Sequence, residues 1–432
     1  MAQPRVSGPG SEACSARHAT ALGQVACELA RGLPVSASPT LVIATAVSGE
    51  LAPERRADLG RRLAAMIAGE LGAHAQAFTS IAALPAAQSQ ARSARVIAVA
   101  VEIDRARLAA TADVLAAPRR FWERFQEQAT RVVAHAFSTR PLDPELRGYL
   151  PKVPLVIGKT HQAVLDEPAV ALACGDLDQD GSPELAVVGR QRTRLGRVVK
   201  GVFRATQVAA WNELSGLSPS PLREPIAAAI VSSDGRLLLG STDRANGVEL
   251  DSELRVLRRY PARIPWGLGG CARRAGLGLS PERVSCSPSA NSVDRTSGSA
   301  SAPDPIDAFA AARAAGDDGT LHEVTAARRQ SDARLRLEIG RRHVEIAEPV
   351  GAQLALGDLD GDGRLELVTT DAGHDPASDS LLVRTLHEDG RATPVLRIPV
   401  GAGLNAVTIC PPGANGFSAL VAAAGDGLWI FE

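Results

Sequence analysis

Two short segments of the chain carry carboxylates at a spacing that suits a metal ion. The acidic residues alternate along a loop, at positions 1, 3, 5 and 9 of each segment. The first segment contributes Asp176, Asp178, Asp180 and Glu184, and the second contributes Asp358, Asp360, Asp362 and Glu366. Alternate carboxylates on a tight loop point at one centre, and hard oxygen ligands in this number favour Ca²⁺. We therefore expect two calcium sites.

The other positions of the two loops support this interpretation. Position 6 is glycine in both, which allows a sharp turn, and the backbone carbonyl of position 7 adds an oxygen from Ser182 or from Arg364. Position 12 is Val187 or Thr369 instead of the bidentate glutamate of an EF-hand, so an EF-hand is excluded. Four or more protein ligands leave little room for a substrate, which predicts a structural ion. The alternative is an Asp-rich turn that only connects two strands.

Patterns typical of enzyme active sites are missing from the sequence. Residues 158–160 resemble the end of a phosphate-binding loop, but Val153 stands where that loop requires glycine. The eight histidines form no HExxH motif, and no GxSxG motif occurs. Trp266 is the best candidate among the four tryptophans for a sugar platform. We predict no catalytic residue and no cofactor-binding residue besides the calcium ligands. Carboxylate pairs for glycoside chemistry are not recognisable from sequence.

The two acidic loops also reveal a repeat. They begin at residues 176 and 358. This separation equals about four propeller blades, since one blade takes about 40–50 residues. Short apolar strands flank both loops, and shortened Asp-Gly copies recur at 234, 318 and 426. This pattern resembles the FG-GAP or VCBS repeat, whose motif is DxDxDG followed by an acidic residue. The resemblance covers 153–432 and implies an all-β propeller with Ca²⁺ in its loops.

The resemblance implies four-stranded blades. The spacing of the strands predicts six blades, with seven as the alternative. We expect the last strand, 428–431, to pair with 155–157 and so close the ring. Residues 285–305 are rich in Ser and Pro, which predicts a mobile insertion.

The first part of the chain mixes the helical period with strand-sized apolar runs. Helices are expected at 15–31, from Pro53 and from Pro118, the last with Val132 and Val133 facing inward. Strands are expected at 41–47, near Phe78, at 97–103 and at 108–114. This order is similar to small α/β envelope domains of Tol-propeller, curli-secretion and flagellar lipoprotein type.

The expected organisation is a multi-domain chain, an N-terminal α/β domain followed by the propeller. Its parts are an N-terminal arm and helix at 1–37, the α/β domain at 38–140, a Pro-rich linker at 141–152 and the propeller at 153–432.

Composition and cysteines restrict the class of protein. A formal net charge of −1, with 45% hydrophobic and 22% charged residues, indicates a globular chain and excludes a strongly basic nucleic-acid binder. No apolar run is long enough for a transmembrane helix.

The six cysteines show none of the spacings typical of zinc ligands. The pairs nearest in sequence are Cys14 with Cys27 and Cys271 with Cys286. In an exported protein we expect the second pair to form a disulfide, and Cys174 to stay a buried thiol.

These observations predict a non-enzymatic, calcium-stabilised propeller that binds or scaffolds partners at the bacterial cell envelope or surface. The expected location is periplasmic, outer-membrane-associated or extracellular. No signal peptide is visible, and a cytoplasmic location stays open. The partner is expected to be a protein, with a glycan as the second choice. The alternative functions are a lectin-like propeller, and a polysaccharide lyase or hydrolase built on a propeller. The candidate partner surface consists of loops 190–197, 244–253, 285–305 and 371–380, of which the first is basic and the last acidic.

Overall fold

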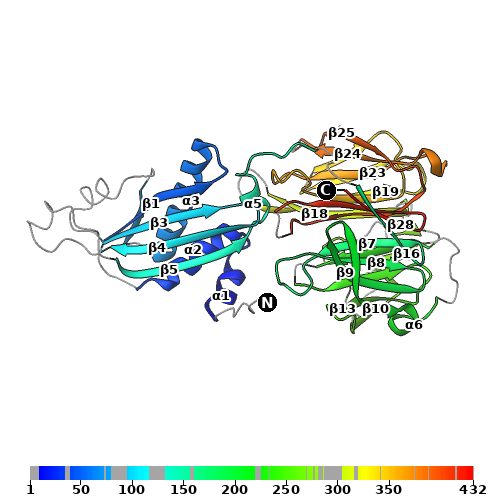
Figure 1. Ribbon diagram of the computed structural model, residues 1–432, viewed down its shortest axis with the longest axis horizontal. Coiled ribbons are helices and arrows are strands. Elements are labelled where there is room, and N and C mark those ends of the chain that lie inside the picture. The colour runs from blue at the N-terminus through cyan, green and yellow to red at the C-terminus, as the bar shows by residue number, and fades with distance from the viewer. Residues whose placement is uncertain are drawn as a thin grey trace, which may run out of the picture. The chain divides into compact units, whose positions relative to one another are not determined.

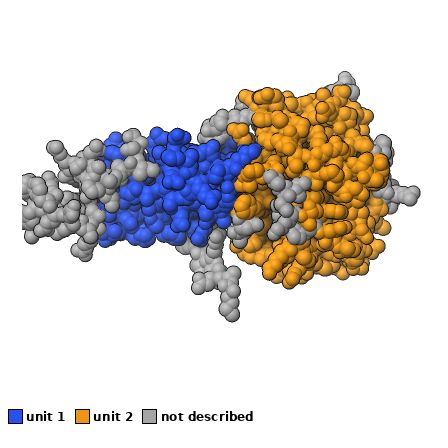
Figure 2. All heavy atoms as spheres, turned by 45° about the horizontal axis from the view of Figure 1, so that its top comes forward, with its two compact units in different colours: residues 1–152, 315–321, 361–363 blue, residues 153–314, 322–360, 364–432 orange. Residues whose placement is uncertain are grey.

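The protein is described here by a computed structural model, which divides into two compact units (Figure 2). Unit 1 comprises residues 1–152, 315–321 and 361–363, and unit 2 comprises 153–314, 322–360 and 364–432. The structure describes residues 9–34, 39–72, 74–78, 95–115, 132–155, 160–218, 225–232, 234–268, 270–275, 278–280, 286, 304–315, 320–340, 342–373, 375–387, 389–413 and 416–431.

Unit 1 combines helices with a five-stranded sheet in the order β2-β1-β3-β4-β5 (Figure 1). Strand β1 is parallel to β2 and β3, whereas β3, β4 and β5 follow one another antiparallel. The strands are β1 Thr40–Gly49, β2 Ala75–Ala77, β3 Arg95–Ile103, β4 Arg107–Leu115 and β5 Val132–Pro141. The helices are α1 Pro9–Arg17, α2 Ala21–Gly32, α3 Pro53–Leu71 and α5 Pro144–Arg147.

Local sequence explains where these helices begin and what they bury. The Thr20 hydroxyl caps α2 by accepting a hydrogen bond from the Gly23 amide at 3.3 Å. Helix α3 begins with Pro53, whose missing N–H costs nothing in the first turn. Its fully buried Leu59, Leu63 and Ile67 recur at helical spacing and belong to one core with buried side chains of α2 and of the sheet.

The end of unit 1 departs from the sequence-based expectation. Val132 and Val133, expected on the inner face of a helix, begin strand β5, and most of that expected helix lies outside the described residues. Segment 141–152, expected to be a linker, contains helix α5. Leu146 of α5 is fully buried in the core of unit 1. Apolar residues between the prolines therefore pack within the unit.

Unit 2 is a β-propeller of five blades, so the expected number of six or seven is wrong. Four sheets have four strands each, and one has seven, in the order β15-β16-β17-β18-β19-β20-β21. In this large sheet, a pairing between Leu279 and Ile306 joins β17 to β18. The strand spacing predicts two blades for this part of the chain, but the structure forms a single sheet there, which lowers the number of blades.

The bounds of the blade strands are as follows. Blade 1 contains β7 Ala169–Gly175, β8 Glu184–Gly189, β9 Arg192–Val199 and β10 Val202–Ala210. Blade 2 contains β11 Ala227–Val231, β12 Leu237–Ser241, β13 Asn246–Leu250 and β14 Val256–Pro261. Blade 3 contains β15 Arg263–Trp266, β16 Gly270–Ala275, β17 Gly278–Leu279, β18 Ile306–Ala315, β19 Leu321–Arg329, β20 Leu335–Ile339 and β21 Arg342–Ile346. Blade 4 contains β22 Leu354–Gly357, β23 Glu366–Thr370, β24 Ser380–Leu386 and β25 Ala392–Pro399. Blade 5 contains β26 Leu404–Cys410, β27 Ala419–Ala424, β28 Gly427–Phe431 and β6 Thr160–Val164.

The first and last strands of unit 2 close the ring in blade 5. Strand β28 pairs antiparallel with β6, with Leu428 opposite Ala163. The expected closure between the two ends of the propeller is therefore present, but the partner strand is 160–164 and not 155–157. Of the expected insertion 285–305, only Cys286, Asp304 and Pro305 are among the described residues.

Three disulfides involve all six cysteines. Cys14 pairs with Cys27, and Cys271 pairs with Cys286, which confirms the expected pairing of the second set. Cys174 of β7 pairs with Cys410 of β26, with their Cα atoms 4.9 Å apart. The expectation of a free thiol at Cys174 is therefore wrong. Blade closure explains the error, because it brings together cysteines that are 236 residues apart in sequence.

Candidate metal centres

The first acidic loop connects β7 to β8 in blade 1. Carboxylate oxygens of Asp176, Asp178 and Glu184 lie within 4.8 Å of one another. Backbone amides shape the loop, because the Gly181 amide donates to Asp176 Oδ2 at 2.8 Å and the Leu177 amide donates to Glu184 Oε2 at 2.8 Å. Gly181 has φ 89°, the left-handed backbone that glycine adopts without strain.

The second acidic loop connects β22 to β23 in blade 4 and repeats this geometry. Oxygens of Asp358, Asp360 and Glu366 lie within 4.8 Å of one another. The Leu359 amide donates to Glu366 Oε2 at 2.9 Å, as Leu177 does to Glu184, and Gly363 has φ 82°. The second cluster is more deeply buried, since Asp358, Asp360 and Glu366 are 6%, 1% and 0% exposed. Asp178 of the first loop is exposed.

A guanidinium distinguishes the first loop. Nη2 of Arg197, on strand β9, lies 2.9 Å from Asp178 Oδ2 and 2.8 Å from Asp180 Oδ2. The same side chain also pairs with Glu184. Arg197 therefore supplies positive charge where the sequence predicts an ion. The loop motif does not contain this residue, and strand pairing brings it there, one position beyond the Leu185–Gly196 pair.

The corresponding position of the second loop carries no formal charge. Glu366 is paired in register with Thr385 of β24, and the Thr385 hydroxyl donates to Glu366 Oε1 at 3.2 Å. The nearby Asp362 forms an ion pair with Lys152 at 3.6 Å. Two loops with the same acidic spacing thus have different residues opposite the glutamate.

Burial and hydrogen bonds set the charge state of the first loop. Burial raises the pKa of Asp176 and also that of Glu184. Burial alone would also raise the pKa of Asp180. The hydrogen bonds from the Ser182 amide and from Arg197 outweigh this effect, so the pKa of Asp180 is lowered overall. Burial alone would lower the pKa of Arg197, but its bonds to Glu184 and Asp180 raise that pKa overall. The charged guanidinium is therefore firmly held.

Not every expected ligand joins these clusters. Asp180 and Asp362 are outside the two groups of close carboxylates. The backbone carbonyls of Ser182 and Arg364 remain predicted ligands. Residues 158 and 159 of the rejected phosphate-loop motif, and the side chain of Trp266, lie outside the described residues.

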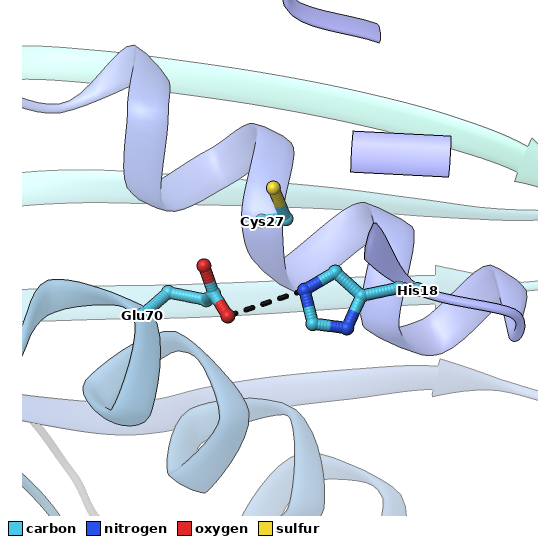
Figure 3. Close-up of side chains that lie close together, drawn as sticks. All are labelled: His18, Cys27 and Glu70. Atoms are coloured by element: carbon cyan, nitrogen blue, oxygen red, sulfur yellow. Dashed lines mark ion pairs between the residues drawn. The ribbon is translucent and has the colours of Figure 1, made fainter. Parts of the chain in front are cut away.

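A third cluster consists of His18, Cys27 and Glu70 in unit 1 (Figure 3). Cys27 forms a disulfide with Cys14, so its sulfur is not a thiolate ligand. Glu70 is engaged by His18 Nε2 at 3.2 Å and by Arg17 Nη1 at 3.0 Å. This group is better explained as an ion-pair network than as a metal site.

Several charged side chains of the segments expected to face a partner form ion pairs within unit 2. Segment 190–197 is mostly strand β9, where Arg194 pairs with Asp166 and Glu167 in addition to the contacts of Arg197. In segment 371–380, Asp371 pairs with Arg397 at 2.6 Å. Arg194, Arg197 and Asp371 are therefore engaged in ion pairs within unit 2, and the partner surface stays a prediction.

The fit of an ion differs between the two loops. Three buried carboxylates with neutral Thr385 opposite suit a hard divalent cation in the second loop. In the first loop Arg197 already lies against the carboxylates that would hold an ion. Across the described residues, no helix has the length and apolar character needed to span a membrane.

Comparisons with known proteins give only distant likenesses. No protein-family model matches the chain, and no curated protein sequence matches it. A selenomethionine-substituted virginiamycin B lyase from Staphylococcus aureus is 11% identical with a TM-score of 0.34, over 63% of this chain and 99% of that chain. A protein of unknown function from Bacteroides caccae is 11% identical with a TM-score of 0.25, over 72% of this chain and 78% of that chain. At these scores the β-propeller assignment rests on the five sheets themselves, and the lyase activity belongs to the matched protein alone.

Proposed function

We propose that the chain is a non-enzymatic, calcium-stabilised propeller protein that binds or scaffolds partners at the bacterial cell envelope or surface. One Ca²⁺ would be held by the second acidic loop, through Asp358, Asp360 and Glu366. The observation that carries the proposal is the close approach of three buried carboxylates in that loop. Carboxylates at this distance repel one another in a site of low dielectric constant, and a divalent cation offsets that repulsion.

The first loop would be held by Arg197 in place of a second ion. At an effective dielectric constant of about 20, a divalent cation 4 Å from a guanidinium is repelled by roughly 8 kcal/mol. A Ca²⁺ ion would therefore have to displace Arg197 from Asp178 and Asp180. The sequence predicts two equal calcium sites. We propose instead one Ca²⁺ ion in the second loop and the Arg197 guanidinium as the cation of the first loop.

The disulfides support the proposed location. All six cysteines are paired, and one of the three bridges joins the first and last blades. Disulfides of this kind persist in oxidising compartments and are rare in the cytosol of most organisms. Extracellular and periplasmic calcium also suits a loop with a small number of carboxylates.

Removal of calcium tests the proposal. Adding Ca²⁺ to EDTA-treated protein should raise the melting temperature of unit 2, because an ion bound only by the folded loop stabilises that fold by mass action, about 2.7 kcal/mol at one hundred times Kd. Asp360→Asn should abolish this increment. Differential scanning calorimetry of the full chain, with and without Ca²⁺, measures both.

The matched control is Asp178→Asn in the first loop. It breaks one ion pair with Arg197 and should lower the melting temperature in both conditions, while the calcium increment stays as in the unmodified protein. Equal increments in Asp360→Asn and in the unmodified protein would overturn the proposed ion site. Calcium-dependent cleavage of a polymeric glycan by the purified chain would overturn the non-enzymatic part.

A further inference from the structure

Unit 1 contains a cavity of about 320 Å³ that the acidic loops do not involve. It lies where three parallel strands begin, since Thr40 of β1, Ala75 of β2 and Arg95 of β3 line it and are paired in register. The last turns of α2 and α3 also contribute to its wall. The volume is at the lower end of the range for small-molecule sites.

The wall of this cavity carries an excess of positive charge. Arg17, Arg31 and Arg95 line it together with a single carboxylate, Glu70, which gives a formal charge of +2 with His74 neutral. Glu70 already forms ion pairs with Arg17 and with His18, the second of which Figure 3 shows. The carboxyl ends of α2 and α3 add about half a negative charge each, which leaves the wall with a formal charge of roughly +1.

Arg95 is the most informative of these side chains. Its Nη1 donates to the Pro34 carbonyl at 2.7 Å, whereas its Nη2 is buried and has no hydrogen-bond partner. Among the described residues, no carboxylate lies within ion-pair distance of Arg95. Burial lowers the pKa of Arg95. A buried donor without a partner is destabilising, and such groups in native proteins call for an explanation.

We propose that this cavity binds a small oxyanion, a phosphate or carboxylate group that accepts hydrogen bonds from Arg95. A planar guanidinium binds both kinds of group with paired donors. Ala30, Leu33, Leu71 and Ala75 supply apolar wall, which suits a short carbon skeleton attached to the anion. The competing explanation is that the arginines only neutralise the carboxyl ends of α2 and α3.

Isothermal titration of the full chain with inorganic phosphate and, separately, with succinate distinguishes the two explanations and the two anion classes. We expect saturable binding of at least one of them, weakened about tenfold or more in Arg95→Gln, because the loss of a charge-assisted hydrogen bond costs that much. Sodium chloride at matched ionic strength controls for simple screening.

The matched control is Arg107→Gln. Arg107 begins the neighbouring strand β4, its side chain is 64% exposed, and it does not line the cavity. This variant should bind like the unmodified protein. Arg31→Gln, at an exposed position of the wall, tests the site if Arg95→Gln does not fold, which circular dichroism shows. Absence of saturable binding by the unmodified chain, or equal binding by Arg95→Gln, Arg31→Gln and Arg107→Gln, would overturn the proposal.

Discussion

At the scale of single residues, Arg197 distinguishes two loops that the sequence presents as equal. The loops share acidic residues at four positions and glycine at position 6. Their difference lies outside the motif, where strand pairing places Arg197 near Glu184 and Thr385 opposite Glu366. Under the proposed function, this difference on the neighbouring strand is what separates the calcium-binding loop from the loop held by Arg197.

Replacing this residue should convert the first loop into a calcium-responsive site. We expect Arg197→Ala to lose about 2 kcal/mol of stability without Ca²⁺, less than for a fully buried pair because the side chain is 35% exposed. Added Ca²⁺ should restore most of this loss, since Asp178, Asp180 and Glu184 are then open to an ion. Urea unfolding with and without Ca²⁺, in the Asp360→Asn background, isolates the first loop.

Arg204→Ala is the control for this change. Arg204 is exposed on β10 and is paired in register with Arg197. Its removal should create no calcium response in the same background. An Arg197→Ala protein that is equally stable in EDTA and in Ca²⁺ would contradict the role given to the guanidinium.

The sequence predicts one part of this site and not the other. Close carboxylates follow from spacing alone, because positions 1, 3 and 9 lie on one turn, and the structure brings Asp176, Asp178 and Glu184 together. Arg197 could not be predicted as their partner, because it is 13 residues from Glu184 and its position depends on strand register. In the sequence alone, Arg197 belongs to a run of basic residues, which predicts an exposed charged segment and not a partner of the acidic loop.

At the scale of elements, a buried carboxylate stabilises the turn between β13 and β14. This carboxylate belongs to Asp251, the first residue after β13. Its Oδ1 accepts hydrogen bonds from the amides of Glu253 and Arg255, both at 2.9 Å, and its Oδ2 accepts from Arg255 Nε at 2.7 Å. Burial would raise the pKa of Asp251, but the bonds to Arg255 and Glu253 lower it overall.

This pKa predicts a pH-dependent contribution of the turn. A carboxyl whose folded pKa is below its unfolded value stabilises the protein above that unfolded value, about 3.9, and loses the contribution as the pH falls through the folded pKa. Asp251→Asn should therefore cost about 1–2 kcal/mol at pH 7. The difference from the unmodified protein should shrink toward pH 3. Urea unfolding at the two pH values measures it.

Glu253→Gln is the control in the same turn. The carboxylate of Glu253 is exposed and pairs with Arg255 at 3.2 Å, so its loss should cost about 0.5 kcal/mol or less. A loss in Asp251→Asn that is the same at pH 7 and pH 3 would show that shape, and not charge, holds the turn.

At the scale of the whole molecule, the sequence predicts a propeller but not its number of blades. Acidic loops and short strands indicate repeated four-stranded units, and four blades have that form. The seven-stranded blade follows from the pairing of β17 with β18, which are separated in sequence by the 285–305 segment. Long-range register of this kind leaves no local pattern, and the same applies to the cysteine pair of β7 and β26.

That pair, Cys174 and Cys410, should contribute more stability than the other bridges. Strand β26 of the last blade packs with β7 of the first, and β28 closes the ring by pairing with β6. In the chain-entropy model, a bridge between residues 236 apart restricts the unfolded chain by about 5 kcal/mol, against about 3 kcal/mol for the 13-residue separation of Cys14 and Cys27.

We therefore expect the double variant Cys174→Ser/Cys410→Ser to unfold at lower urea concentration than Cys14→Ser/Cys27→Ser. Amide hydrogen exchange should also quicken in β6, β7, β26 and β28, because without the covalent link the closing blade opens locally before the rest of the ring. Exchange measured by mass spectrometry on the full chain assigns the opening to these strands. Unchanged protection there would contradict this, and would mean that the β28–β6 pairing and the apolar packing between β26 and β7 suffice to hold the ring closed.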